Sequence, residues 1–279
     1  MARPLSVLCA LALVASLGRP AHADDPSPDA VLEQRAPAIV SLKFILKADG
    51  NESQTEVLGT VIDPTGLVVL PNADLGGDGV KASDVKVLFG SDPKEWEAVI
   101  VARDKVLSLA YLQVLGLGEK GVPAIDFVAG PEPKLGLGLY GVSREGRGFD
   151  FAPSIQRCYV SSRVEKPRLM WGVSGDFATA GLPVFDMAGR AVGLLADQDS
   201  SEGAAQEGES TTTGTFLLPL ADVTRSLAAA KKRVPEAVAK AEAAKKEPPP
   251  EAAPKAPEAP KAPDAPKAPE TPKAPESPK

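Results

Sequence analysis

The chain has 279 residues, with 31 Lys and Arg against 37 Asp and Glu, 28 Pro, 2 Cys and a single His. The net charge is −6: residues 24–230, with 18 basic and 29 acidic side chains, carry −11, and the rest of the chain carries +5. The phosphate backbone of a nucleic acid is negatively charged and would be repelled by so acidic a body. We therefore expect no binding of nucleic acid. The length allows one or two domains with a sizeable core.

Residues 1–23 have the layout of a secretory signal peptide. Arg3 precedes an apolar run from Leu5 to Leu17, and Ala21-His22-Ala23 provides a small-residue cleavage site. The apolar run is short for a membrane span, so we favour cleavage over an uncleaved anchor. The expected location is the periplasm or the extracellular space, with no transmembrane segment after cleavage. Cleavage would also remove His22, the only histidine of the chain.

Cys158 is the only cysteine left in a chain that begins at Asp24. One thiol cannot form an internal disulfide, although an exported protein could keep one. Cys158 lies in a strand-like run, so we expect a buried small apolar residue rather than a reactive thiol.

The predicted elements begin with one short helix and continue with strands. Ser27 and Pro28 are typical of a helix start, and Pro37 ends the helix after about Arg35. Apolar runs separated by Gly/Pro turns then predict strands at 38–46, 58–62, 67–70, 85–89, 96–101, 107–114, 135–142, 155–161, 182–185, 191–196 and 215–218.

Short strands at this spacing indicate an all-β fold, a sandwich or a barrel. About 190 residues is large for one sandwich, so two stacked antiparallel barrels fit better. Trp96 and Trp171 are expected in the barrel core or in a cleft wall. The run Leu135-Gly136-Leu137-Gly138-Leu139 is expected to be a strand with a close contact rather than a phosphate loop.

After residue 196 the sequence predicts three successive segments: a loop, a helical segment and a Pro-rich tail. Residues 197–213 are acidic and rich in Ser, Gly and Thr, and we expect a loop; the carboxylates of Asp197, Asp199 and Glu202 lack the spacing of a calcium loop. Helical patterns follow at 221–234 and 236–246, with Pro235 expected to interrupt them.

A proline then recurs every third residue from Pro254 to Pro278, which predicts a polyproline II rod. The expected divisions are a signal peptide (1–23), a folded body (24–230), a helical linker (231–246) and a Pro/Lys/Glu-rich tail (247–279). The tail is either a spacer or arm, or a low-complexity end without a partner.

The order of the motifs resembles that of trypsin-like serine proteases, in particular the bacterial Deg-type group. Residues 58–72 resemble the hairpin that leads to the family's catalytic histidine, and 85–114 its next hairpin and following strand. Residues 178–195 are similar to the segment around the nucleophile, and 214–219 to the closing strand. The resemblance covers about residues 30–230 and implies two six-stranded β-barrels.

The same resemblance implies where a catalytic triad would lie, and this chain departs from it at each place. The histidine position falls on Ala73, the aspartate position on Ser108 and the serine position on Ala180. A second register places Phe177 at the nucleophile, which is again no serine. After the expected cleavage removes His22, the mature chain has no histidine and cannot run a Ser–His mechanism. We therefore expect no catalytic residues, no cofactor and no metal, which describes a pseudoprotease.

Three functions stay open from the sequence. The first is a binding module that holds a polypeptide or envelope partner in the cleft, with the tail as spacer; we favour it. The second is a structural envelope protein that acts through its tail. The third is a serine-type endopeptidase with a non-standard site, for which Thr179 or Ser174 would need Lys105 or Lys43 as a base. Asp74 and Asp104 are expected to be loop and turn carboxylates.

Overall fold

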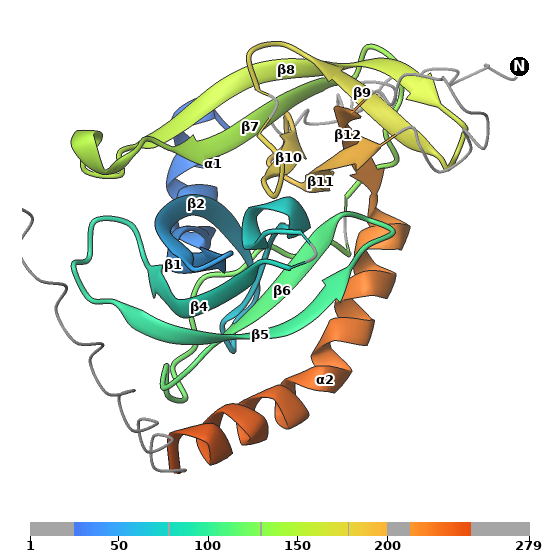
Figure 1. The fold of residues 1–279 in the computed structure, drawn as a ribbon. Helices are drawn as coiled ribbons and strands as arrows, with labels where there is room; N and C mark the ends of the chain where they lie inside the picture. Colours follow the sequence, from blue (N-terminus) through green and yellow to red (C-terminus); the bar gives the residue numbers. More distant parts are fainter. Residues whose placement is uncertain (1–24, 78, 129, 178, 200–212, 247–279) are drawn as a thin grey trace, which may run out of the picture.

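The structure is a computed structural model and describes residues 25–77, 79–128, 130–177, 179–199 and 213–246. The predicted leader (1–23), Glu202 and the predicted tail (247–279) lie outside these residues. The described chain forms two closed antiparallel barrels of six strands each, one above the other in Figure 1. This confirms the predicted fold class.

The first barrel follows α1 (Pro28–Arg35) and the 3₁₀ turn η1 (Ala36–Ala38). Its strands are β1 (Ile39–Ala48), β2 (Asn51–Asp63), β3 (Leu67–Pro71), β4 (Lys81–Leu88), β5 (Trp96–Asp104) and β6 (Leu109–Val114). They pair in the order β1-β2-β3-β6-β5-β4, and the 3₁₀ turn η2 (Asn72–Leu75) follows β3.

The second barrel pairs its strands in the order β10-β11-β12-β9-β8-β7. Its elements are β7 (Gly138–Arg144), the 3₁₀ turn η3 (Arg147–Phe149), β8 (Pro153–Val164), β9 (Met170–Ser174), β10 (Pro183–Asp186), β11 (Ala191–Asp199) and β12 (Thr213–Pro219). The helix α2 (Leu220–Lys246) follows directly.

The helix start is built as its sequence indicates. The side chain of Ser27 accepts a hydrogen bond from the backbone N–H of Ala30, Pro28 opens the helix, and Asp29 lies in the first turn. Val31 is buried on the side that faces the body. This short helix therefore begins and ends where its capping residues and Pro37 predict.

Strand β2 is longer than the sequence indicates. It pairs with β1 without interruption from Thr60↔Ile39 to Asn51↔Ala48, whereas only residues 58–62 were expected. Its first half is polar and exposed, so it lacks the apolar alternation that marks a strand. The signal that was missed is the turn: Asp49 and Gly50 both have positive φ (48° and 79°), as a two-residue hairpin requires.

Strand β9 was not predicted at all, and it completes the second barrel. It is five residues long, with only Met170 and Trp171 buried, and it pairs with β12 through Leu217↔Trp171. Pro167 and two glycines, Gly172 and Gly175, lie within or beside it. These residues ordinarily indicate a loop, and here the neighbouring strand β8 overrides them through five aligned pairs.

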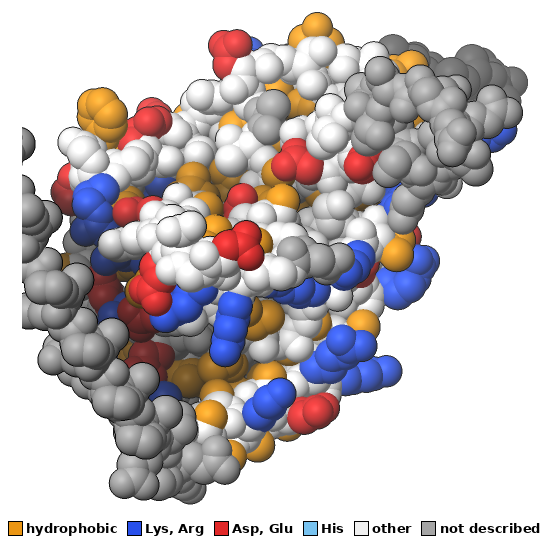
Figure 2. Space-filling model, viewed as in Figure 1, with side chains coloured by type: hydrophobic (Ala, Val, Ile, Leu, Met, Phe, Trp, Pro, Cys, Tyr) orange, Lys and Arg blue, Asp and Glu red, His pale blue; other side chains and the backbone are white. Residues whose placement is uncertain are grey.

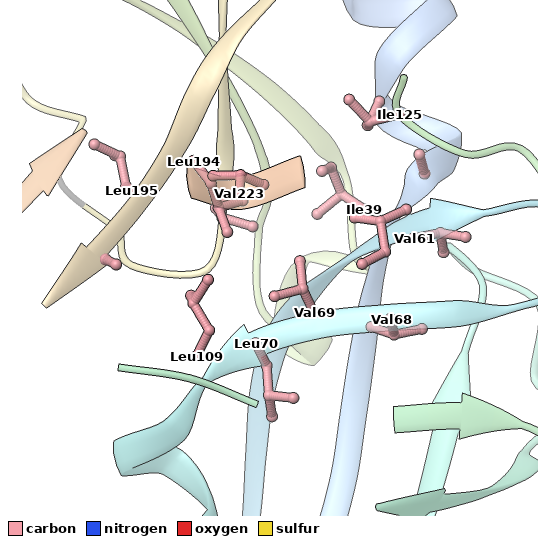
Figure 3. Close-up of a cluster of buried hydrophobic side chains, with 14 of the residues drawn as sticks. Ile39, Val61, Val68, Val69, Leu70, Leu109, Ile125, Leu194, Leu195 and Val223 are labelled. Atoms are coloured by element: carbon pink, nitrogen blue, oxygen red, sulfur yellow. The ribbon is translucent and has the colours of Figure 1, made fainter. Parts of the chain in front are cut away.

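One continuous buried cluster joins the two barrels. Ile39 and Leu70 of the first barrel, Leu194 and Leu195 of the second, and Val223 of α2 belong to it (Figure 3). A buried hydrogen bond crosses between the barrels as well, because the hydroxyl of Thr60 donates to the carbonyl oxygen of Gly181 over 2.8 Å.

Helix α2 starts at the second barrel and packs along the first (Figure 1). Val223, Ser226 and Ala230 are its buried residues. The Tyr111 hydroxyl of β6 donates to Oγ of Ser226 (2.7 Å), and Ser226 donates to Oδ2 of Asp104 (2.6 Å). Oδ1 of Asp104 accepts the N–H groups of Val106 and Leu107, so Asp104 is a turn carboxylate, as predicted.

Pro235 does not interrupt the helix, contrary to expectation. The helix runs through it to Lys246, and Figure 1 shows α2 bent along its length. Proline cannot donate to the carbonyl one turn earlier and its ring crowds that carbonyl, so a bend is the usual compromise. Lys231 pairs with Asp63, and Lys245 pairs with Glu97, which tie both halves of α2 to the first barrel. Within the described residues, no helix has the length and apolar character needed to span a membrane.

Ser226→Ala is expected to destabilise the protein by about 2 kcal/mol, since the substitution leaves the Tyr111 hydroxyl and one Asp104 oxygen without their partner. The free energy of unfolding, from urea titration, measures the effect. Tyr111→Phe and the double variant complete a cycle, and we expect the two changes to be clearly non-additive. Additive effects would show that the three groups do not act as one network.

Candidate functional site

A cleft of about 560 Å³ is formed by residues of both barrels. The first barrel contributes residues of β1, β2, the end of β3 and η2; the second contributes the end of β7, the turn after it, the segment before β10, and β11. The lining residues are Ser41, Glu56, Val57, Leu58, Pro71, Asp74, Arg144, Glu145, Gly146, Arg147, Phe151, Thr179, Ala180 and Asp197.

The segments that carry the three positions implied by the resemblance meet beside this cleft, although neither Ala73 nor Ser108 is among its described lining residues. Ala180 lines it, and Ala73 lies in η2 between Pro71 and Asp74, which both line it. The carbonyl oxygen of Ser108 accepts the N–H of Asn72 (2.9 Å), which brings the aspartate position beside the histidine position.

The third position is brought to the other two by a close backbone contact. Gly181, next to Ala180, lies so near Pro71 that a Cβ on it would come within 2.5 Å of the proline ring. Two alanines and one serine therefore occupy the three positions, and of these residues Ala180 lines the cleft. Phe177, the alternative at the nucleophile position, is buried against Gly141 and does not line the cleft.

Gly181 and Leu182, which follow Ala180, are used for packing. Gly181 has a φ of +81° and donates its N–H to the carbonyl of Leu195 (2.8 Å), while its own carbonyl accepts the Thr60 hydroxyl. Leu182 is fully buried. An oxyanion site needs backbone N–H groups that are free and aimed at one point. The single N–H of Gly181 is already bonded to Leu195, so Gly181 offers no free donor to an oxyanion.

The alternative nucleophiles and bases are not gathered in one place. Thr179 is exposed and lines the cleft, but neither Lys43 nor Lys105 does. Nζ of Lys43 contacts Oε1 of Glu95 at 2.5 Å, on another part of the first barrel. Ser174 ends strand β9 and does not line the cleft either.

Two of the four carboxylates that line the cleft are aspartates, and they come from opposite barrels. Asp74, which the sequence suggested was a loop residue, lies in η2 of the first barrel, and Asp197 lies on β11 of the second. Asp197 is a strand residue that pairs with Thr215, so the prediction that it begins a loop was wrong. The hydroxyl of Thr215 donates to Oδ1 of Asp197 (2.6 Å) and fixes its position.

Burial, together with repulsion from Asp197, raises the pKa of Asp74 to about 6. The pKa rises because the Asp74 carboxyl is partly removed from water and lies near the negative charge of Asp197 rather than near a positive charge. No described residue forms an ion pair with Asp74. A carboxyl in this state is destabilising when ionised.

Asp74→Asn is therefore expected to stabilise the protein at pH 7.5, by about 1 kcal/mol once partial exposure is allowed for. The folded-state pKa lies above the ordinary value, so the cost of ionisation is absent below about pH 4 and complete above about pH 6. The gain should thus fall toward zero at pH 4. Urea titrations of both proteins at the two pH values measure it, and an equal gain at both would contradict the assignment.

The arginines of the cleft are already engaged. Arg144, at the end of β7, donates to the carbonyl oxygens of Ile39 (2.7 Å), Ala36 (2.8 Å) and Phe151 (2.9 Å), and burial lowers its pKa. Arg147 pairs with Glu56 at 3.3 Å. Neither guanidinium pairs with Asp74 or Asp197, so the two arginines of the lining do not neutralise these carboxylates.

The other predicted site residues have structural surroundings. Cys158 is buried, as expected, and burial raises the pKa of its thiol to about 11. Trp171 is buried in the core, and Trp96 is half-buried with Nζ of Lys94 3.4 Å from its ring centroid. Among the residues that the structure describes, no group of three or more His, Cys, Asp or Glu side chains is placed to hold a metal ion.

The comparisons with known proteins give no family: no family model matches the chain, and no curated protein matches it significantly. The fold itself is informative. Two closed six-stranded antiparallel barrels with a cleft between them fit a chymotrypsin-like fold.

Proposed function

We propose that this protein is an inactive, exported homologue of the trypsin-like serine proteases, of the bacterial Deg type, which holds an extended polypeptide in its cleft without cutting it. One observation supports the proposal: the segments with the three triad-like positions lie close together beside the cleft, and these positions hold Ala73, Ser108 and Ala180. A Ser–His–Asp mechanism needs a nucleophile, a base and a group that orients the base. None of the three residue types remains at its position.

The cleft supports peptide binding independently of chemistry. Val57, Leu58, Pro71 and Phe151 give it apolar walls, and β2 and β11 run along it. A groove beside strands suits an extended chain, because backbone hydrogen bonds and side-chain contacts can both form there. In this proposal the leader directs export, and the Pro-rich tail is a spacer for a partner in the cell envelope.

Fluorescein-labelled, unfolded casein tests the proposal with the purified protein. We expect binding, measured by fluorescence anisotropy, and no release of acid-soluble fluorescence during prolonged incubation. Ala180→Trp fills the cleft and should abolish binding, whereas Leu135→Trp, at an exposed residue outside the cleft, should not. Absence of casein binding would overturn the peptide-holding function.

Catalysis is tested in the same experiment. Casein cleavage that Ala180→Trp abolishes would show an active site in the cleft and overturn the inactive assignment. Labelling of the protein by a fluorophosphonate would further point to a serine mechanism, with Thr179 and Ser174 as the nearest hydroxyls to examine.

A further inference from the structure

We infer that the cleft selects polypeptides with a lysine or arginine side chain, which it binds between the carboxylates of Asp74 and Asp197. The inference rests on the proposed peptide-holding function and specifies the peptides that it would hold. It does not concern the lost catalytic groups, because Asp74 and Asp197 correspond to none of the three triad-like positions.

The geometry of the cleft supports this choice of ligand. Each barrel contributes one of the two carboxylates, and both line the same space of about 560 Å³. Beside them the walls are apolar, through Pro71, Leu58 and Phe151. The long aliphatic stem of a lysine or arginine suits apolar walls, and its charged end suits a carboxylate pair.

The charge of the cleft is complementary to a cation. Its charged lining residues are four acids, Glu56, Asp74, Glu145 and Asp197, and two bases, Arg144 and Arg147. Arg147 is paired with Glu56, and the guanidinium of Arg144 donates to three backbone carbonyls. Glu145 is exposed at the rim. Among the residues that the structure describes, no cation pairs with either aspartate, and the place is partly desolvated, so an ion pair gains more there than at the surface.

Hydrogen bonds also fix the Asp197 side chain and the backbone turn that carries Asp74. Thr215 holds Oδ1 of Asp197, which leaves Oδ2 for a ligand. On the other side, the η2 turn that carries Asp74 is fixed by Arg103, whose guanidinium donates to the carbonyls of Gly76 (2.7 Å) and Leu75 (3.0 Å). Fixed carboxylates bind a cation without first losing conformational freedom.

Three pools of fluorescein-labelled dodecapeptides test the inference on the purified protein. The flanking residues are randomised among Gly, Ala, Ser, Thr and Val, and the central residue is Lys, Gln or Glu. At pH 7.5 and low salt we expect the Lys pool to bind about tenfold more tightly than the Gln pool, and the Glu pool more weakly than either. Lowering the pH to 5 should remove much of the Lys preference, because Asp74 then takes up a proton.

Matched variants locate the effect. Asp74→Asn and Asp197→Asn should each reduce the Lys preference, the ratio of the Lys-pool to the Gln-pool affinity, several-fold. The double variant Glu33→Gln/Glu119→Gln removes two negative charges from exposed residues outside the cleft and should keep the preference. Circular dichroism and urea titration confirm that each variant is folded.

The outcomes separate this inference from the proposal on which it rests. Equal binding of the Lys and Gln pools would overturn the cation preference and leave peptide holding intact. A Lys preference that survives both aspartate variants would also overturn the inference, because the attraction would then come from the acidic body as a whole. If no pool binds, peptide holding fails as well.

Discussion

Replacing Phe177 with alanine is expected to lower the free energy of unfolding by about 4 kcal/mol. The Phe177 side chain is 2% exposed, and its ring lies directly on β7, where a Cβ built on Gly141 would come within 2.2 Å of ring atoms. Gly141 has no side chain that could move into the space left by the ring. The cavity would therefore stay open, which is the condition under which truncation of a buried aromatic side chain costs most.

Urea titration of the wild type and the variant measures the loss. Phe149→Ala is the control, because Phe149 is 73% exposed and its removal should change the stability by less than about 0.5 kcal/mol. Similar effects of the two substitutions would contradict the placement of Phe177 inside the second barrel.

Arg144→Met should produce the second largest effect, a loss of about 3 kcal/mol. The substitution keeps most of the aliphatic stem but leaves three carbonyl oxygens, those of Ala36, Ile39 and Phe151, without their donor. Two of these carbonyls belong to the segment that enters the first barrel, whereas Arg144 ends a strand of the second. The side chain thus joins the barrels at one edge of the cleft.

Arg147→Met provides the comparison, three residues further along the chain. Arg147 is exposed and its pair with Glu56 is 3.3 Å long, so its loss should cost less than about 1 kcal/mol. Thermal unfolding of both variants decides the point. Equal melting temperatures for the two variants would show that the backbone contacts of Arg144 contribute little.

The sequence predicts the barrels well because most of their strands alternate or are continuously apolar. Strand β6, for example, is buried along its whole length and stands out as an apolar run between polar turns. Strand β9 and the first half of β2 escape the same reasoning, because neighbouring strands, and not their own residues, make them strands. Such tertiary effects leave no local pattern to read.

The candidate site, too, could be predicted only in part from the sequence. The order of the motifs predicts that Ala73, Ser108 and Ala180 belong to one place, and the structure brings their segments together. The sequence could not predict that Asp74 and Asp197 line the same cleft, because they are 123 positions apart and neither belongs to a recognisable motif. Strand β11 continues from the apolar run 191–196 through Asp197 to Asp199, and no alternation of apolar and polar residues marks this extension in the sequence.

Because helix α2 packs against the first barrel, that barrel cannot complete its contacts until the C-terminal end of the folded part has been made. Chains leave the ribosome or an export channel with the N-terminal end first, and their early parts begin to fold first. Yet the Tyr111 hydroxyl and the Asp104 carboxylate of the first barrel find their partner only in Ser226, after the whole second barrel. In a chain that ends before Ser226, the Tyr111 hydroxyl and the Asp104 carboxylate therefore lack this partner and α2 does not cover the first barrel. Such a truncated chain is expected to be more accessible to proteases.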